Sequence, residues 1–391
     1  MRPFFNDRHG PNPWGPLVRL AVGAAFYCAV SACDFKLPQP PPDLFYKAGV
    51  MAVGRGPQFL ASEDLNRDGE TDLVSVNTLE NSVSILYGTG TGTFQHPVSL
   101  PVFAEPTMAA AGDLNRDGLP DLALSSRGEH CVTLLLAKGG GSFQTPRKME
   151  TGRAPVSLVL DDFNGDNLLD MAVTLTFNKM EIFMGAGGGN FKKGETYNTG
   201  SRSLSGVSGD FNRDGRKDIA LAETGSNSSS IRIFSGNGDG TFRQTSAFAD
   251  GLGSLVLIKK DMNGDGRDDL VTASTKGDNL YLFYANGDGT FGKGLPFSGG
   301  GGPIALVAED FNGDGRVDVA VANSRSSGFS FVARDPDGSF KYPTRDYVTG
   351  GTPLAIAAGD FNDDGLPDLA VASADENRVE IFLRRRTASG Q

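Results

Sequence analysis

A nine-residue segment recurs seven times along this chain, and its regular spacing constrains the fold more than any other feature. The first copy is Asp64-Leu-Asn-Arg-Asp-Gly-Glu-Thr-Asp72, with Asp or Asn at positions 1, 3, 5 and 9 and glycine at position 6. The later copies follow at intervals of 49, 49, 48, 51, 49 and 50 residues and begin at Asp113, Asp162, Asp210, Asp261, Asp310 and Asp360. A period this constant indicates a repeat architecture in which each unit is one supersecondary structure.

Oxygen-bearing side chains at alternate positions of a tight loop suit a hard cation such as Ca²⁺, which takes six to eight oxygen ligands. The side chains can turn inward while glycine at position 6 supplies the sharp bend. We therefore predict up to seven structural Ca²⁺ ions, each bound by three aspartates and one asparagine. The predicted ligands are Asp64, Asn66, Asp68, Asp72, Asp113, Asn115, Asp117, Asp121, Asp162, Asn164, Asp166, Asp170, Asp210, Asn212, Asp214, Asp218, Asp261, Asn263, Asp265, Asp269, Asp310, Asn312, Asp314, Asp318, Asp360, Asn362, Asp364 and Asp368.

These loops are not EF-hands, although they share several positions with them. An EF-hand needs a bidentate Glu at position 12 and helices on both sides. Position 12 holds no acid in any copy; it is Ser75, Leu124, Val173, Leu221, Thr272, Val321 and Val371. The residues after each loop alternate with period two, as in Asp318-Val-Ala-Val-Ala, which predicts a strand.

The third loop has Asn167 at position 6; since Asn tolerates the left-handed conformation, we expect a strained but functional site.

Each repeat contains four strand-like stretches. A Pro or Ser lies seven residues before the first Asp, an apolar run leads to the loop, and a second and a third run follow, such as Ile231-Arg-Ile-Phe234. A glycine-rich turn then leads to a phenylalanine at which we expect the fourth strand to begin; these are Phe94, Phe143, Phe191, Phe242, Phe291 and Phe340. Four strands in about 50 residues, without helical periodicity, are typical of propeller blades. The predicted fold is an all-β, seven-bladed propeller of four-stranded antiparallel blades.

The seventh repeat lacks this phenylalanine and its fourth strand, because the chain ends in the polar segment Arg384–Gln391. A spare strand-like segment, Phe45–Val53, precedes the first repeat. We predict that this segment completes the last blade and leaves no open sheet edge. The propeller domain is then residues 44–391.

On these motifs the repeats resemble the FG-GAP or VCBS repeats of the integrin alpha-subunit propeller and of many exported bacterial proteins. The resemblance covers residues from about 45 to 383. It implies a seven-bladed propeller with a calcium ion in the loop between the first two strands of each blade.

The N-terminal residues 1–32 have the pattern of an export signal. Arginines precede a short apolar run, Leu20–Val30, which is too short to span a bilayer. The run ends in Val30-Ser-Ala-Cys33, which resembles a bacterial lipobox and predicts lipidation of Cys33; an ordinary signal peptide cleaved nearby is the alternative. Residues 33–43 are proline-rich, which is typical of an extended linker, so we interpret them as a tether. We expect an exported lipoprotein, in the periplasm or at the cell surface, whose membrane contact is the lipid on Cys33 alone.

Side chains that commonly act in catalysis are scarce in the chain after the signal. It holds two histidines, His96 and His130, and no Gly-x-Ser-x-Gly elbow or phosphate loop. Cys131 lies in an apolar run and is expected to be buried and inert. We expect no enzyme, with a calcium-dependent polysaccharide lyase kept as an alternative because some such lyases use similar loops.

The net charge and the aromatic content limit the kinds of partner that we expect. The net charge is −11, which seven divalent ions would bring to about +3, so most of the acidity belongs to the loops. No basic patch indicates nucleic-acid binding. A lectin is the second alternative, although the single tryptophan, Trp14, lies in the signal. The leading hypothesis is a monomeric interaction scaffold that binds a protein or glycan on one face, with Thr224–Ser230 and Asn323–Gly328 as candidate loops.

Overall fold

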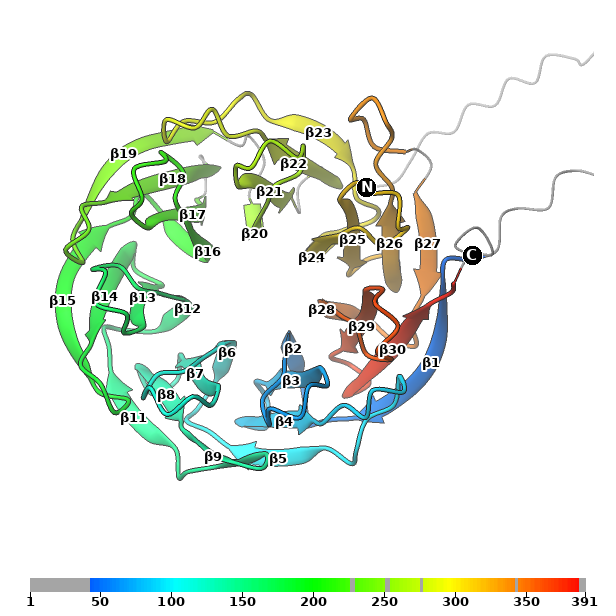
Figure 1. The fold of residues 1–391 in the computed structure, drawn as a ribbon, viewed down its shortest axis with the longest axis horizontal. Helices are drawn as coiled ribbons and strands as arrows, with labels where there is room; N and C mark the ends of the chain where they lie inside the picture. Colours follow the sequence, from blue (N-terminus) through cyan, green and yellow to red (C-terminus); the bar gives the residue numbers. More distant parts are fainter. Residues whose placement is uncertain (1–42, 226–228, 250–253, 275–276, 342–343, 387–391) are drawn as a thin grey trace, which may run out of the picture. The chain divides into compact units, whose positions relative to one another are not determined.

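The computed structural model describes residues 43–225, 229–249, 254–274, 277–341 and 344–386. Of the thirty strands in the described residues, twenty-eight form seven four-stranded antiparallel sheets, and the other two make a small hairpin. The seven sheets are arranged as the blades of a ring (Figure 1). The described residues contain no helix that could cross a membrane. The predicted seven-bladed, all-β propeller is confirmed.

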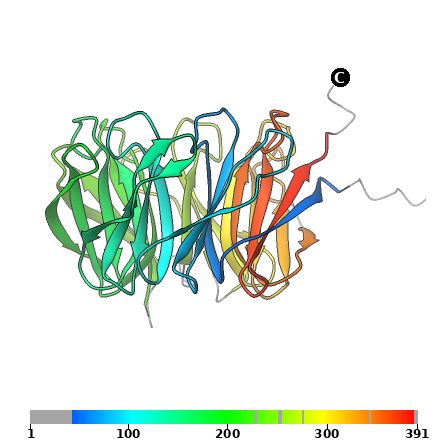
Figure 2. The same cartoon turned by 90° about the horizontal axis from the view of Figure 1, so that it is seen from below.

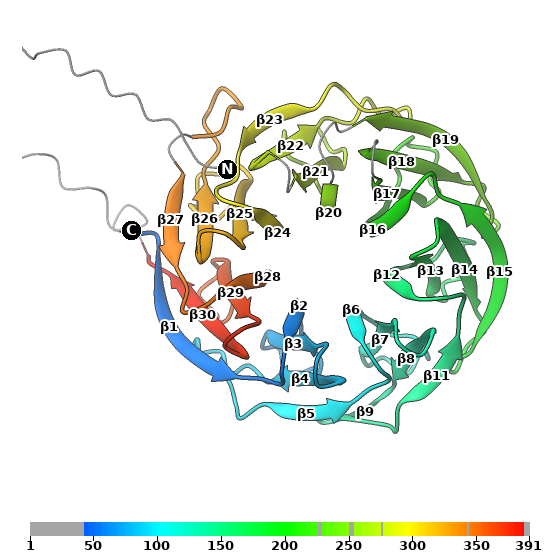
Figure 3. The ribbon, with the colours of Figure 1, turned by 180° about the vertical axis from the view of Figure 1, so that it is seen from behind.

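Six blades are continuous in the chain, and their strands follow chain order from the axis outward (Figures 1 and 3). Blade 1 consists of β2 (Pro57–Glu63), β3 (Asp72–Asn77), β4 (Ser82–Leu86) and β5 (Val98–Pro101). Blade 2 consists of β6 (Pro106–Gly112), β7 (Asp121–Ser126), β8 (Cys131–Leu135) and β11 (Arg147–Glu150), with the hairpin β9 (Ala137–Gly139) and β10 (Ser142–Phe143) beside it. Blade 3 consists of β12 (Pro155–Asp161), β13 (Asp170–Leu175), β14 (Lys179–Gly185) and β15 (Phe191–Asn198).

The second half of the ring repeats this plan. Blade 4 consists of β16 (Arg202–Gly209), β17 (Asp218–Thr224), β18 (Ser229–Gly236) and β19 (Phe242–Ala249). Blade 5 consists of β20 (Ser254–Lys260), β21 (Asp269–Ser274), β22 (Asn279–Phe283) and β23 (Leu295–Ser298). Blade 6 consists of β24 (Pro303–Glu309), β25 (Asp318–Asn323), β26 (Gly328–Val332) and β27 (Arg345–Val348). Blade 7 consists of β28 (Pro353–Gly359), β29 (Asp368–Ser373), β30 (Arg378–Arg384) and β1 (Phe45–Ala52).

Burial explains the alternation of large and small residues in the second strands. Every residue of β7 and of β25 is buried, because both faces of a blade pack against neighbouring blades. The core is accordingly a series of clusters, each shared by two adjacent blades; one joins Leu73 of blade 1 to Ala370 and Ile381 of blade 7. Small side chains let the sheets approach near the axis, and larger ones fill the space between them.

The ring is closed by the N-terminal strand, as predicted. Strand β1 pairs antiparallel with β30, with Tyr46 opposite Leu383 and Val50 opposite Glu380 (Figure 1). One detail of the prediction is wrong: Arg384 belongs to β30 and is buried, so it is not part of a polar tail.

The predicted start of the fourth strands is also wrong in most blades. Strands β15 and β19 do begin at Phe191 and Phe242. In blades 1, 5 and 6 the phenylalanine makes a single bridge instead, to Gly88, Ala285 and Arg334 respectively, and the regular strand begins further along the chain. In blade 2 the equivalent residue, Phe143, belongs to the β9–β10 hairpin. Phe94, Phe291 and Phe242 all pack on a ring of the preceding blade, so this packing is kept whether or not the regular strand begins at the phenylalanine.

Candidate metal-binding loops

All seven loops lie on one face of the ring. In each blade the loop joins the innermost strand to the second strand, and its ninth residue is the first residue of that second strand. The turns between the second and third strands lie on the opposite face (Figure 2). We call these the loop face and the turn face.

The aspartate at position 9 is fully buried in every loop. In the first loop, Oδ2 of Asp72 accepts a hydrogen bond from the backbone N–H of Leu65 at 3.0 Å. Oδ1 accepts a second one from Gly88, beyond the third strand, at 2.8 Å. The same pair of bonds occurs in five of the other six loops. In the sixth loop the first donor is the N–H of Asn312 at position 3, and the second is that of Arg334. Each position-9 carboxylate therefore ties its loop to the end of the third strand.

Burial changes the acidity of these carboxylates. It disfavours the charged form and raises the pKa of Asp72 and Asp121 to about 6, and that of Asp318 and Asp368 to about 7, even though the backbone N–H bonds lower it. The aspartates at positions 5 and 1 of the same loops raise it further, because like charges lie nearby.

The side chains at positions 1, 3 and 5 fold the loop around themselves. In the first loop the N–H of Asp68 donates to Asp64 Oδ1 at 3.2 Å and to Asn66 Oδ1 at 2.8 Å. The N–H of Gly69 donates to Asp64 Oδ2 at 3.0 Å, and that of Glu70 donates to Asp68 Oδ1 at 2.9 Å. The same four bonds recur in all seven loops.

The donor set fits Ca²⁺ in its chemistry. Asp64 and Asn66 present oxygens to one shared N–H, so these oxygens lie close together, and each carboxylate oxygen has a second lone pair for a cation. In the part of the chain that the structure describes, no three Asp, Glu, His or Cys side chains form a group that could hold a metal. The position-9 oxygens accept backbone N–H groups, so calcium binding requires them to take the cation in addition.

Two positions of every loop have left-handed backbone. At position 6, Gly69 has a φ of 92° and Asn167 has a φ of 62°, so Asn167 adopts the conformation expected of it. Position 4 is left-handed as well, which the sequence analysis missed; these residues are Arg67, Arg116, Gly165, Arg213, Gly264, Gly313 and Asp363. Glycine at position 4 in three of the seven loops was the available signal.

The third loop allows a simple test of this strain. We expect Asn167→Gly to stabilise the protein by up to about 1 kcal/mol, because the left-handed conformation is unfavourable for a residue with a Cβ. We expect Asn167→Ala to destabilise it by a similar amount, because alanine has a Cβ and lacks the polar side chain that makes this conformation tolerable for Asn. Chemical denaturation of the three proteins measures this. A destabilised glycine variant would contradict it.

The residue at position 2 anchors each loop in the core between blades. It is large, apolar and buried in all seven copies, which are Leu65, Leu114, Phe163, Phe211, Met262, Phe311 and Phe361. The phenylalanine of the next blade packs on it edge to face: Phe242 lies 5.2 Å from Phe163, and Phe291 lies 5.6 Å from Phe211, between ring centroids. The sequence analysis missed this role, although an apolar residue at position 2 of every copy was visible.

Backbone bonds connect the same neighbours. The N–H of Gly240 donates to the carbonyl of Phe163 at 3.2 Å, and the N–H of Gly289 donates to that of Phe211 at 3.0 Å. At the ring closure, the N–H of Gly92 in blade 1 donates to Phe361 of blade 7 at 2.7 Å. Each of these loops is thus held by its own blade and by the next one.

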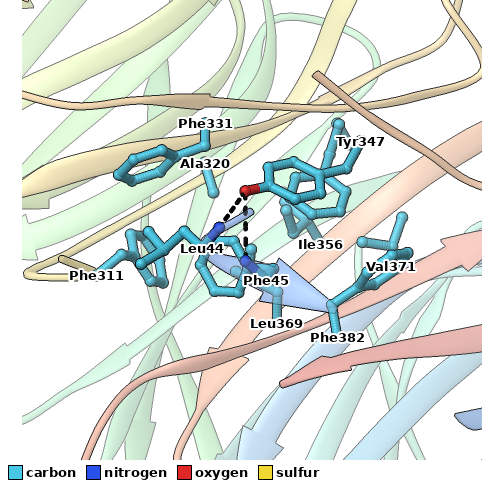
Figure 4. Close-up of a cluster of buried hydrophobic side chains, with 12 residues drawn as sticks. Leu44, Phe45, Phe311, Ala320, Phe331, Tyr347, Ile356, Leu369, Val371 and Phe382 are labelled. Carbon is cyan, nitrogen blue, oxygen red and sulfur yellow. Dashed lines mark hydrogen bonds between the residues drawn. The ribbon is translucent and has the colours of Figure 1, made fainter. Parts of the chain in front are cut away.

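In the last blade, Phe45 replaces the phenylalanine that the seventh repeat lacks. Its ring lies 5.7 Å from that of Phe311, the position-2 residue of the sixth loop, and 5.6 Å from Tyr347 (Figure 4). The Tyr347 hydroxyl accepts the N–H of Leu44 at 3.0 Å. The N-terminal strand thus gives blade 7 the contact with the preceding blade that a phenylalanine of the repeat itself gives blade 4 and blade 5.

Protein-family models match these repeats. The model described as FG-GAP-like repeat matches residues 64–124, 113–173, 162–221, 261–321 and 310–371, and the FG-GAP repeat model matches residues 352–391. Together the matches span well over half of the chain. The chain belongs to the FG-GAP repeat family. No curated protein sequence matches this FG-GAP protein.

Solved structures share the fold at low sequence identity. This FG-GAP chain is similar to BBS1N, crystallised in complex with ARL6DN and soaked with lead, with a TM-score of 0.61 and 14% identity over 88% of this chain and 98% of that chain. A mercury-soaked crystal of the same complex gives a TM-score of 0.62 at 13% identity, with the same coverage. A protein from Lactobacillus plantarum gives a TM-score of 0.58 at 16% identity over 78% of this chain and 89% of that chain. These likenesses show the propeller fold.

Other expected sites lie elsewhere. Cys33, the signal and nearly all of the tether lie outside the described residues. Cys131 is a free, buried thiol on β8 in this FG-GAP protein, and burial raises its pKa to about 11. It is therefore a thiol and not a thiolate at neutral pH, in agreement with an inert core residue.

Proposed function

We propose that this FG-GAP propeller is a calcium-stabilised interaction scaffold on the cell envelope that binds its ligand on the turn face. The observation that carries the proposal is the contrast between the two faces. The loop face repeats one sequence pattern seven times, whereas the turns at residues 78–81, 127–130, 176–178, 324–327 and 374–377 have no common sequence. A surface that differs from blade to blade can recognise an asymmetric partner.

Exposed apolar side chains on the turn face support a protein ligand. Leu79 is 69% exposed and Phe177 is 57% exposed, each on a turn between the second and third strands. The guanidinium of Arg153 lies over the Phe177 ring, 5.3 Å from its centroid. Exposed aromatic and arginine side chains are enriched at interface hot spots. The neighbouring propeller BBS1N was crystallised with a protein partner, which adds support from the fold.

Calcium would serve structure in this scaffold. The oxygens at positions 1, 3, 5 and 9 of each loop would hold it, and the ion would neutralise carboxylates that otherwise repel one another beside the core. Similar donors in all seven loops favour one shared structural role over a single catalytic ion. We propose no enzymatic activity.

A capture experiment tests the ligand face. Immobilised protein, incubated with solubilised envelope proteins, should retain a specific partner that Phe177→Ala loses. Tyr46→Ala is the matched control, because Tyr46 is a partly exposed aromatic that also stacks with an arginine, Arg385 at 4.8 Å, but lies on the outer strand β1. Equal losses in both variants would contradict a turn-face site. Retention of envelope glycans in place of a protein, measured on a glycan array, would favour the lectin alternative.

Membrane attachment gives a separate prediction. Cys33→Ala should move the exported protein from the membrane fraction to the soluble fraction while the propeller stays folded, because a lipid on this residue is the proposed anchor. Fractionation and immunoblotting measure this, with Cys131→Ala as the control that keeps the lipid. Continued membrane association of the exported Cys33→Ala protein would contradict the lipoprotein assignment.

A further inference from the structure

Residues of the innermost strands of all seven blades line a cavity of about 480 Å³. These strands surround the ring axis (Figures 1 and 3). Its size is within the range of small-molecule sites, roughly 300 to 1,000 Å³. A second cavity of about 360 Å³ shares Leu60, Ile258, Val307 and Ile356 with it and continues to the Lys260–Glu309 ion pair, which lies toward the loop face. The two cavities therefore adjoin at these four residues.

The wall of the larger cavity is mostly apolar. Val156, Leu204 and Leu354 line it and are only partly buried. They belong to none of the hydrophobic clusters between blades that the described residues form, so they are not needed to fill those cores. The polar hydroxyl of Thr107 is already bonded to the Val156 carbonyl at 2.9 Å. An apolar chain fits this wall, whereas a sugar would find few hydrogen-bonding partners on it.

The charged side chains that line the larger cavity are both positive, in a protein whose net charge is −11. Arg127 and Arg202 line the cavity, and no Asp or Glu does so. Arg202 is the first residue of β16, and Arg127 follows β7, so both lie at the turn face. Arg127 Nε donates to Glu105 Oε2 at 3.0 Å, and no carboxylate among the described residues pairs with Arg202. The mouth of the cavity therefore carries an uncompensated positive charge.

We propose that the axial cavity binds a linear amphiphile with an apolar chain and a terminal carboxylate, a ligand that the scaffold function does not require. The chain lies between the innermost strands, and the carboxylate meets Arg202 and Arg127 at the turn face. Guanidinium groups bind carboxylates through paired hydrogen bonds, and the apolar wall gains from removing the chain from water. Strands of seven residues span roughly 23 Å, which accommodates an extended chain of medium length.

Binding of dodecanoate to the full protein, measured by calorimetry below its micellar concentration, tests the proposal. We expect a single site, and we expect dodecyltrimethylammonium, which has the same chain and the opposite charge, not to compete for it. Arg202→Gln should weaken dodecanoate binding about tenfold, because one charge-assisted pair of hydrogen bonds is lost. Arg55→Gln is the matched control, since Arg55 is exposed just before β2 on the same face and does not line the cavity; this variant should bind as the unchanged protein does.

A second variant tests the location of the chain. Val156→Trp should fill the cavity and abolish binding while the melting temperature stays near that of the unchanged protein, because Val156 lies outside the blade cores. Normal binding by a folded Val156→Trp protein would overturn the proposal. So would equal binding of the anionic and cationic amphiphiles, equal effects of Arg202→Gln and Arg55→Gln, or no binding of dodecanoate by the unchanged protein.

Discussion

Deletion of Phe45–Val53 is expected to unfold the propeller, because it removes the outer strand of blade 7 and leaves β30 as an open sheet edge. It also removes Phe45, which is 1% exposed and contacts Phe311 and Tyr347 (Figure 4). The single change Phe45→Ala should cost about 3 to 5 kcal/mol, as expected for a large buried aromatic ring. Circular dichroism and chemical denaturation of the purified variants measure both effects.

Two matched variants separate ring closure from a general effect of altering the ends of the chain. Tyr46→Ala, on the same strand with its side chain 38% exposed, should cost no more than about 1 kcal/mol. Deletion of residues 387–391 should have little effect, because β30 and its last hydrogen bond, from Arg385 N–H to the Leu44 carbonyl, are kept. A Phe45–Val53 deletion that melts like the unchanged protein would contradict closure by β1.

Ring closure was predictable because two independent counts agreed. The seventh repeat is one strand short, and Phe45–Val53 is one strand too many, so antiparallel pairing of the two ends follows from the need to cover a sheet edge. The number of blades and the position of the loops were predictable for a related reason: seven copies in one register remove the ambiguity that a single turn-like segment carries.

The contacts between blades were not predictable in the same way. The role of Phe242 depends on Phe163, which lies in the preceding repeat, and periodicity within a repeat does not show which neighbour a side chain faces. The backbone bonds of Asp72 to Leu65 and Gly88 were hidden for another reason. Aspartate can act as a metal ligand or as a buried hydrogen-bond acceptor, so the sequence pattern fits either role.

Removal of calcium should lower the melting temperature by many degrees. We expect loose sites, with dissociation constants of roughly 10⁻⁴ to 10⁻³ M, which are typical of extracellular modules. At a free concentration ten times the dissociation constant, each site contributes about 1.4 kcal/mol, so seven sites together contribute on the order of 10 kcal/mol. Differential scanning calorimetry with calcium and with EDTA measures this, and elemental analysis counts the bound ions. Asp310→Ala should reduce the calcium effect more than Asp162→Ala, because the loop of Asp162 is the one strained by Asn167.

The effect of calcium on the melting temperature should depend on pH. A destabilising effect of EDTA that is unrelated to the loop carboxylates would not show this dependence. In the metal-free protein, burial raises the pKa of Asp72 and Asp121 from 3.8 to about 6 and that of Asp318 and Asp368 to about 7. The folded state then holds protons that the unfolded state has released, so the metal-free protein should lose stability as the pH rises from about 4 to about 7. Calcium favours the ionised carboxylates and should remove this loss, so the difference in melting temperature between the two conditions should widen from pH 5 to pH 8. A difference that is constant with pH, or a melting temperature that EDTA does not change in a protein without bound metal, would contradict calcium binding by these loops.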